Sequence, residues 1–144
     1  MPVIKVLTNH KKVSEGFEIR LSVLMARVMK RPESQIFVTV ETDVRMTRGR
    51  LTDPLAILDV TSSTHLTPVL TEEYTVALCE FIQQELLLEP DCVLINYRSI
   101  RPELIGFNGH ILPENQPIIS LNHLIFGLLI AFFVWFSLHS YRNM

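Results

Sequence analysis

The chain opens with a strand–helix–strand pattern over residues 2–40, PVIKVLTNHKKVSEGFEIRLSVLMARVMKRPESQIFVTV. Residues 3–7 are a short, mostly apolar run that predicts a strand. Ser14 is a good N-cap, and the apolar residues after it recur at helical spacing, which predicts a helix that ends before Pro32. Apolar and polar residues then alternate from Ile36 to Val40, which is the period of a second strand.

The same order of elements returns in the second half of the body. Residues 55–60 are mostly apolar and predict a third strand. Thr67-Pro68 predicts the N-cap and first turn of a second helix, although Thr71 with the two glutamates after it offers a competing start. Residues 92–97, CVLINY, predict a fourth strand. The order β-α-β-β-α-β predicts an α/β fold of the α+β kind, with two helices on a four-stranded mixed sheet.

Several of the predicted strands are apolar at consecutive positions, which is typical of a sheet buried on both faces. Two helices cover only one face. A second copy of the chain is the simplest cover for the other face, and we predict a homo-oligomer on that ground. The alternative is that a few exposed apolar residues are normal on any domain.

Composition excludes several classes of protein. The chain has 144 residues, 48% of them hydrophobic and 19% charged, which is one domain's worth. Residues 1–114 hold 12 basic and 15 acidic residues, a net charge of −3, and this argues against a nucleic-acid partner. Two cysteines make neither a disulfide framework nor a structural zinc site. Phosphate-loop and zinc-protease motifs are absent from the sequence, so we expect no metal and no cofactor.

The last residues differ sharply from the body. Residues 115–141 contain no Asp, Glu, Lys or Arg, and residues 124–136, LIFGLLIAFFVWF, are apolar throughout. A helix over residues 118–138 would be about 30 Å long, close to one hydrocarbon core. We therefore predict a hydrophobic helix over residues 118–140 that acts as a tail anchor, with the body in the cytosol. A helix that lies in the membrane interface or docks on protein is the alternative.

Pro2 is the one residue at the start of the chain with unusual chemistry. Removal of Met1 would expose its secondary amine directly before the first strand. An α-amino group has an ordinary pKa of about 7.7 to 8.0, and burial lowers that pKa because it disfavours the charged form. A neutral amine near pH 7 is a competent general base. Pro2 is a candidate base on these grounds, and the alternative is that proline is common near chain starts.

Four motifs carry a resemblance to a known family: MPVI at 1–4, RPESQIFV at 31–38, INY at 95–97 and IGFNG at 105–109. In this order they resemble the macrophage migration inhibitory factor and D-dopachrome tautomerase family. The resemblance implies a tautomerase domain over residues 1–111, followed by a linker over residues 112–117, and a homotrimer. The tail suggests a nematode-type member. Family members act outside cells without a leader, so secretion without a signal peptide is the alternative localisation.

The resemblance also implies an activity and its residues. The activity is cofactor-free keto–enol tautomerisation of a small aromatic 2-oxo acid, of the phenylpyruvate tautomerase or L-dopachrome isomerase type. Pro2 matches the general base, and Arg31, where the family usually has Lys, matches the residue that binds the substrate carboxylate. The other matching positions are Ser63, through its backbone, Asn96, supplied by a neighbouring subunit, and Ile105 and Phe107, as the apolar wall.

Departures from the family pattern leave a second function open. Leu94 and Gln35 stand where well-studied members have pocket tyrosines. Residues 55–58, LAIL, replace a Cys-x-x-Cys linked to thiol redox activity, so we carry no oxidoreductase function over. The alternative to an enzyme is a cytokine-like protein that binds a cell-surface receptor or another partner and has a vestigial pocket.

Overall fold

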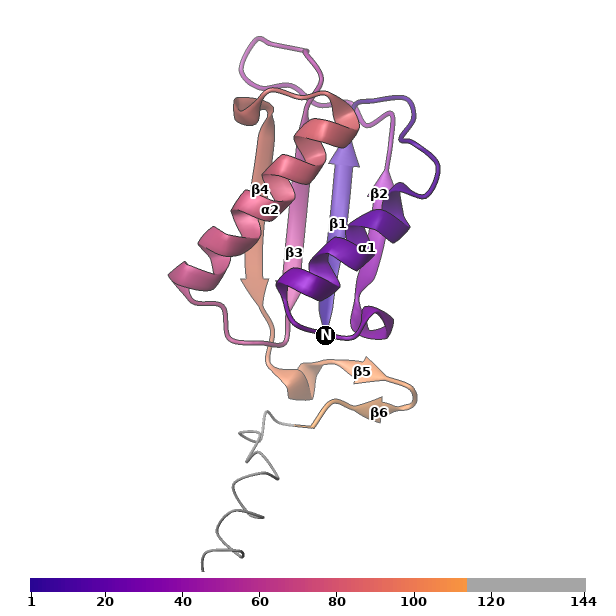
Figure 1. Cartoon of the computed structure of the whole chain (residues 1–144), viewed down its shortest axis with the longest axis vertical. Coiled ribbons are helices and arrows are strands. Elements are labelled where there is room, and N and C mark those ends of the chain that lie inside the picture. The colour runs from indigo at the N-terminus through magenta and orange to yellow at the C-terminus, as the bar shows by residue number, and fades with distance from the viewer. Residues whose placement is uncertain (114–144) are drawn as a thin grey trace, which may run out of the picture. The chain divides into compact units, whose positions relative to one another are not determined.

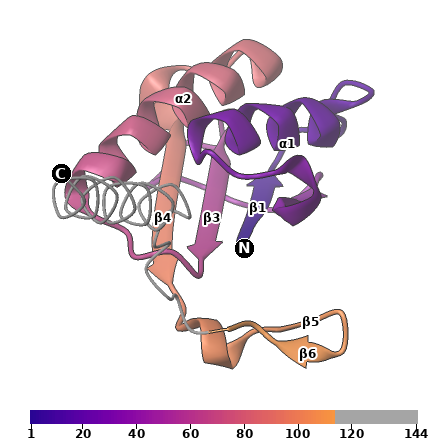
Figure 2. The ribbon, with the colours of Figure 1, turned by 60° about the horizontal axis from the view of Figure 1, so that its bottom comes forward.

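The computed structural model describes residues 1–113, whose arrangement Figure 1 shows. One mixed sheet has the strand order β2-β1-β3-β4, and the two helices lie on one of its faces, as the turned view of Figure 2 shows. The main elements are β1 (Pro2–Thr8), α1 (Phe17–Val28), β2 (Phe37–Glu41), β3 (Ala56–Ser62), α2 (Pro68–Leu86) and β4 (Val93–Ser99). The short elements are the 3₁₀ turns Glu33–Gln35, Pro90–Cys92 and Pro102–Leu104, and the hairpin strands β5 (Gly106–Phe107) and β6 (His110–Ile111).

The sheet consists of two strand–helix–strand units. β1 runs parallel to β2, and β3 runs parallel to β4, while β1 and β3 pair antiparallel at the centre. This confirms the predicted β-α-β-β-α-β order with two helices on a four-stranded mixed sheet. Met1–Leu112 forms one compact unit. The boundaries of the 1–111 domain, the 112–117 linker and the 118–140 helix remain predictions.

Alternation along the strands decides which side chains meet the helices. Every second residue of β1 and β3 is buried on the helix side, as Ile4, Val6, Leu58 and Val60 show. The helices meet this layer with residues four positions apart, which are Phe17, Leu21 and Met25 on α1 and Tyr74, Leu78 and Ile82 on α2. Full burial of one large aliphatic or aromatic side chain contributes about 1.5–3 kcal/mol, so this layer is the core of the fold.

The opposite face of the sheet has no cover within residues 1–113. Val3, Phe37 and Leu94 lie on it by strand alternation and are 43%, 43% and 55% exposed. Lys5 and Glu41 form an ion pair there, with 2.7 Å between Nζ and Oε1. We call this surface the uncovered face; its burial by a second copy of the chain stays a prediction.

The two helix starts differ in how well the sequence predicted them. The Ser14 N-cap is wrong, because α1 begins at Phe17 and its N-cap is Gly16 in the left-handed conformation, with φ of 73°. The Ser14 hydroxyl instead donates to Glu85 Oε2 at 2.6 Å and so ties the start of α1 to α2. Thr67 is the N-cap of α2, since its hydroxyl accepts from the Leu70 N–H at 3.3 Å.

The predicted tail anchor needs a correction. α2 is the longest helix among residues 1–113, with 19 residues, and it carries four glutamates. Carboxylates are costly in hydrocarbon, and this part of the chain has no helix that is both long and apolar enough to cross a bilayer. The prediction of membrane attachment with a cytosolic body is therefore wrong for the described chain. Residues 118–140, on which it was placed, lie outside the described residues.

Candidate active site

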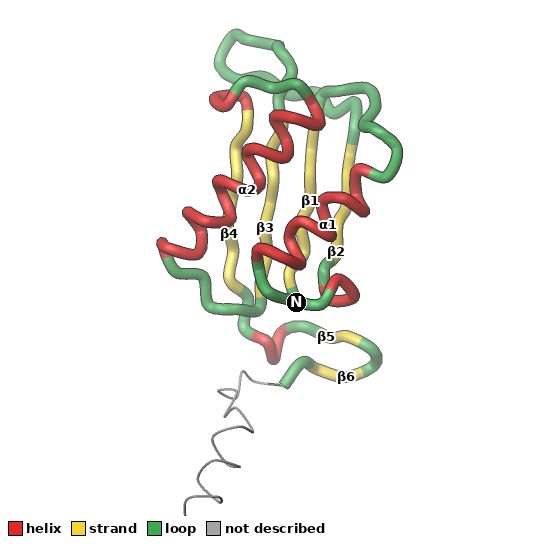
Figure 3. The backbone as a smooth tube through the Cα atoms, viewed as in Figure 1, coloured by secondary structure: helices red, strands yellow, loops and turns green. Residues whose placement is uncertain are grey.

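Four segments meet at the end of the sheet where β1 begins and β3 and β4 end, which we call the proline end (Figure 3). They are the amino terminus, the turn after α1, the loop after β3 and the β5–β6 hairpin. Because β1 and β2 are parallel, α1 returns the chain to this end, and β3 returns it here again. The topology therefore gathers residues that are up to about a hundred positions apart in the sequence.

The amino terminus is partly enclosed. The Pro2 ring is fully buried, and Pro2 pairs with Ser62 at the end of the β1–β3 ladder. The Met1 amino group donates a hydrogen bond to Ser63 Oγ, and Ser63 is itself buried. Burial, and after it the positive charge of Arg31, lower the pKa of the Met1 amino group below its ordinary value. An amine at this place is thus neutral at a lower pH than an exposed one.

Arg31 reaches the same place through the end of α1. Lys30 adopts a left-handed conformation with φ of 52°, and the Arg31 N–H donates to the Ala26 carbonyl at 2.9 Å, which closes the helix. The Arg31 side chain is half-buried. Its Nη2 donates to Thr64 Oγ1 at 3.0 Å, so the guanidinium lies over the loop that follows β3.

An apolar cavity of about 300 Å³ opens beside the amino terminus. Its walls come from the starts of β1 and β2, the end of β3 and the hairpin, and the lining residues are Met1, Val3, Phe37, Thr61, Ile100, Ile105, Gly106 and Phe107. The rings of Phe37 and Phe107 meet edge to face with centroids 6.0 Å apart. Such a cavity suits a small planar apolar group with a polar head at the amine and Arg31.

The structure gathers five of the six predicted site residues and leaves one apart. Ile105 and Phe107 line the cavity, and Ser63 contacts the amino terminus that precedes Pro2. Asn96 lies on the uncovered face. Ser99, which pairs through Ser62 with Pro2, is three residues further along β4, so Asn96 lies about 10 Å along the strand from the level of Pro2, which we call the Pro2 row. Its Nδ2 donates to Asp59 Oδ1 at 3.0 Å. Asn96 therefore has no place in the cavity of its own chain.

Sequence reasoning missed several residues of the site, of which Phe37 and Thr64 bear most on its chemistry. Phe37 contributes to the wall, and the alternation of residues 36–40 places it opposite the helices, so the pattern contained this signal. Thr64 holds Arg31, but nothing in the residues around Thr64 indicates a partner 33 positions away. Within residues 1–113 no group of three His, Cys, Asp or Glu side chains is arranged to hold a metal ion.

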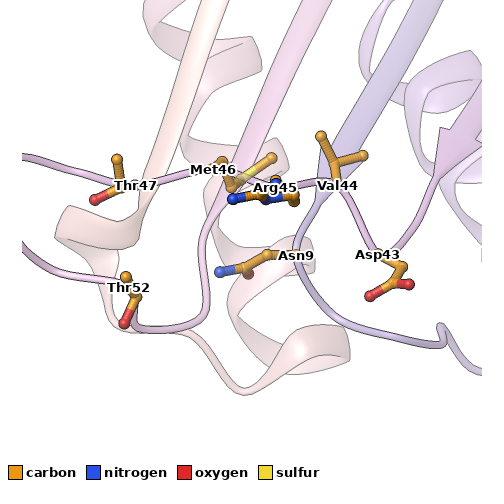
Figure 4. A pocket seen from close by; sticks show the side chains of 7 residues that line it. All are labelled: Asn9, Asp43, Val44, Arg45, Met46, Thr47 and Thr52. Atoms are coloured by element: carbon orange, nitrogen blue, oxygen red, sulfur yellow. The ribbon is translucent and has the colours of Figure 1, made fainter.

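A larger hollow of about 520 Å³ lies at the other end of the sheet, which we call the far end (Figure 4). Its lining residues are Asn9, Asp43, Val44, Arg45, Met46, Thr47 and Thr52. The Asn9 amide braces this loop, because Nδ2 donates to the Asp53 carbonyl at 2.9 Å and Oδ1 accepts from the Leu55 N–H at 2.8 Å. This hollow is therefore a braced loop, and its lining includes neither an aromatic ring nor the amino terminus.

The family model described as macrophage migration inhibitory factor matches residues 1–113. The chain belongs to the macrophage migration inhibitory factor family. This confirms the family to which the four motifs pointed, and the match spans the proline end, the cavity and the far end alike.

Individual relatives agree with this membership. MIF-like protein mif-3 of Caenorhabditis elegans is 69% identical over 140 residues, which cover 96% of each chain. MIF-like protein mif-2 of the same nematode is 34% identical over 116 residues, which cover 79% of this chain and 97% of that protein. Macrophage migration inhibitory factor of Rattus norvegicus is 32% identical over 111 residues, which cover 76% of this chain and 96% of that protein.

Solved structures share the fold at lower identity. Macrophage migration inhibitory factor from Oncomelania hupensis superposes with a TM-score of 0.75 at 18% identity, covering 79% of this chain and 99% of that one. The homologue from Prochlorococcus marinus gives a TM-score of 0.73 at 24% identity, covering 77% and 99%. The chain therefore has the tautomerase fold of the macrophage migration inhibitory factor family, with its two helices on a mixed four-stranded sheet.

Proposed function

We propose that this protein is a cofactor-free keto–enol tautomerase of small aromatic 2-oxo acids, of the phenylpyruvate tautomerase or L-dopachrome isomerase type. The observation that supports this most is the half-buried amino terminus, whose pKa is lowered, beside Arg31 and at the mouth of an apolar cavity. Once Met1 is removed, the Pro2 nitrogen becomes the terminal amine in these surroundings.

The proposed reaction moves one proton. The neutral Pro2 nitrogen takes a proton from C3 of the 2-oxo acid, and the electron pair of that C–H bond becomes the C2–C3 double bond. The C2 carbonyl oxygen gains a proton from water, which gives the enol, and Pro2 returns its proton to solvent. Arg31 binds the carboxylate and offsets the negative charge that develops on the oxygen.

The apolar wall orients the rest of the substrate. Ile105 leads into β5, Phe107 lies in β5 and Phe37 lies in β2, and all three line the cavity with Met1. We expect them to hold the aromatic ring of the substrate. A fixed ring and a fixed carboxylate hold C3 against the base, so that the encounter becomes a positioned one. The backbone of Ser63, next to the amino terminus, is proposed to assist binding.

A homotrimer is part of this proposal. The uncovered face exposes Val3, Phe37 and Leu94, and two neighbouring copies would bury it. Asn96 lies about 10 Å from the Pro2 row in its own chain and would join a cavity only by projecting from a neighbour. Light scattering on the purified chain, with three times the monomer mass expected, tests the assembly; a monomer would contradict it.

A second function has one observation in its favour. Leu94 is 55% exposed on the uncovered face, where the family resemblance places a tyrosine hydroxyl that helps bind substrate. Loss of that hydroxyl favours a cytokine-like protein that binds a cell-surface receptor or another partner without turnover. Such a protein would keep partner binding when the pocket is disabled.

Phenylpyruvate turnover by purified protein without Met1 tests the enzyme. Pro2→Gly replaces a ring-fixed secondary amine with a flexible primary amine, and we expect kcat/KM to fall by roughly 10²- to 10⁴-fold, the range that general bases contribute. Arg45→Ala, at the far end, is the matched control and should turn over normally. Equal turnover of Pro2→Gly and the parent protein would refute the assignment.

A further inference from the structure

We propose that Thr64 is a positioning residue that fixes the Arg31 guanidinium and makes the cavity selective for free 2-oxo carboxylates over their esters. This inference rests on the proposed function, because it concerns the same site. It concerns a residue that neither the motifs nor the family pattern singled out.

The contact itself is specific. Arg31 Nη2 donates to Thr64 Oγ1 at 3.0 Å, and both residues are half-buried. No carboxylate among residues 1–113 forms an ion pair with Arg31. Within the described chain the guanidinium is therefore oriented by a neutral hydroxyl, and its charge is not offset by an acidic partner.

Thr64 is in turn held by the ends of two strands. Its N–H donates to Ser62 Oγ at 3.1 Å, and its carbonyl accepts from Ser99 Oγ at 3.3 Å. Ser62 and Ser99 pair with one another at the proline end. Because the side chain of threonine is β-branched, its rotamers are few. The hydroxyl that Arg31 contacts thus sits on a backbone fixed to the sheet.

The shape of the guanidinium turns this anchor into selectivity. Arginine has five N–H donors in a planar fork, and the Thr64 contact uses one of them. Pinning one side of the plane fixes the direction of the remaining donors, which can bind both oxygens of a carboxylate. An ester group is uncharged and has no anionic oxygen, so it gains little from the fixed fork. A lysine, the usual residue here in the family, is a point charge with no plane to fix.

The experiment compares Thr64→Val, which keeps the shape and removes the hydroxyl, with the parent on phenylpyruvate and on its methyl ester. We expect kcat/KM for the acid to fall about tenfold through KM, as for the loss of one hydrogen bond to a charged group. Turnover of the ester should stay the same, so the ratio of acid to ester falls. Thr64→Ser should restore the ratio, and Thr52→Val, at the far end, should leave it unchanged.

A parallel fall for acid and ester would overturn the proposal, since that is the mark of a merely structural role. An unchanged acid-to-ester ratio in Thr64→Val would overturn it too. If Thr64→Val does not fold, the same ratio is read from Thr64→Ala. Pro2→Gly separates this inference from the proposed function: unchanged turnover there refutes the enzyme itself, whereas loss of turnover there with a normal Thr64→Val ratio refutes only the role of Thr64.

Discussion

The two ends of the sheet both carry a hollow, and the larger one is the poorer candidate site. The far end has about 520 Å³ of space and the proline end about 300 Å³. At the far end the Asn9 amide is hydrogen-bonded to the backbone of residues 53 and 55. At the proline end Met1 lines an apolar cavity, and the Arg31 guanidinium, close enough to lower the pKa of the Met1 amine, has donors left over. An amine of lowered pKa at an apolar cavity therefore marks a candidate site better than volume does.

Among the substitutions that compare the two ends, Arg31→Ala against Arg45→Ala should show the largest difference. Hydrogen bonds to charged groups contribute about 1.5–3 kcal/mol, so losing the carboxylate contact should lower kcat/KM for phenylpyruvate by roughly 10- to 100-fold. Arg45 lies in the far hollow, and its removal should change nothing. Steady-state kinetics of both variants decide it, and an equal loss in the two would erase the distinction between the ends.

Asn9→Ala should separate stability from activity. The substitution removes two hydrogen bonds to the loop backbone at 2.9 and 2.8 Å, and each contributes about 0.5–1.5 kcal/mol. We expect the free energy of unfolding to fall by about 1–3 kcal/mol in urea titrations, with turnover of the folded protein unchanged. A loss of turnover without a loss of stability would make the far end part of the site.

Leu87→Gly should give a smaller effect of opposite sign. Leu87 is the C-cap of α2 at the far end and adopts the left-handed conformation, with φ of 52°. Its side chain is 89% exposed, so the substitution removes backbone strain and little packing. A non-glycine residue in this conformation costs roughly 1 kcal/mol. Leu87→Gly should raise the free energy of unfolding by about that amount, while Leu87→Ala should not. Equal stability of both variants would show that the conformation carries no strain.

The smallest expected effect is a shift in the pH midpoint of turnover between the parent and Arg31→Ala. Burial and then Arg31 lower the pKa of the Met1 amine, and we expect the same surroundings to lower that of the Pro2 amine once Met1 is removed. Because the neutral Pro2 amine is the proposed base, kcat/KM should rise with pH and level off below the ordinary range of an α-amino group. Arg31→Ala removes a positive charge and should move the midpoint to higher pH. The methyl ester is the suitable substrate, because it needs no carboxylate contact. An unmoved midpoint would show that Arg31 and the amine are not coupled.

Local patterns predicted the elements better than the contacts between them. Three apolar runs and one alternating stretch predict the four strands of the main sheet, and helical spacing of apolar residues predicts the two helices. Thr67 is the N-cap that its place before Pro68 predicts. The Ser14 N-cap was wrong because its hydroxyl donates a hydrogen bond to Glu85, 71 residues away, and a local sequence pattern does not indicate a partner at that separation. Gly16, with positive φ, was available in the sequence as the cue.

The site divides along the same line. Pro2, Arg31, Ser63, Ile105 and Phe107 were placed by motif resemblance, and the parallel crossovers bring them to one end. Thr64 was not predicted, because its contact with Arg31 depends on how α1 ends and β3 turns. Asn96 pairs with Asp59 in its own chain, so its predicted role depends on a neighbouring copy. Side-chain contacts across long separations are what the sequence alone leaves undetermined.

The most direct measurement places one alanine between Met1 and Pro2 and compares phenylpyruvate turnover with the parent, after intact mass has shown that each chain has lost Met1. The insertion keeps the proline ring and turns its nitrogen into an amide, which is not basic. We expect kcat/KM to fall by roughly 10²- to 10⁴-fold. Turnover equal to that of the parent would show that the Pro2 nitrogen is not the base.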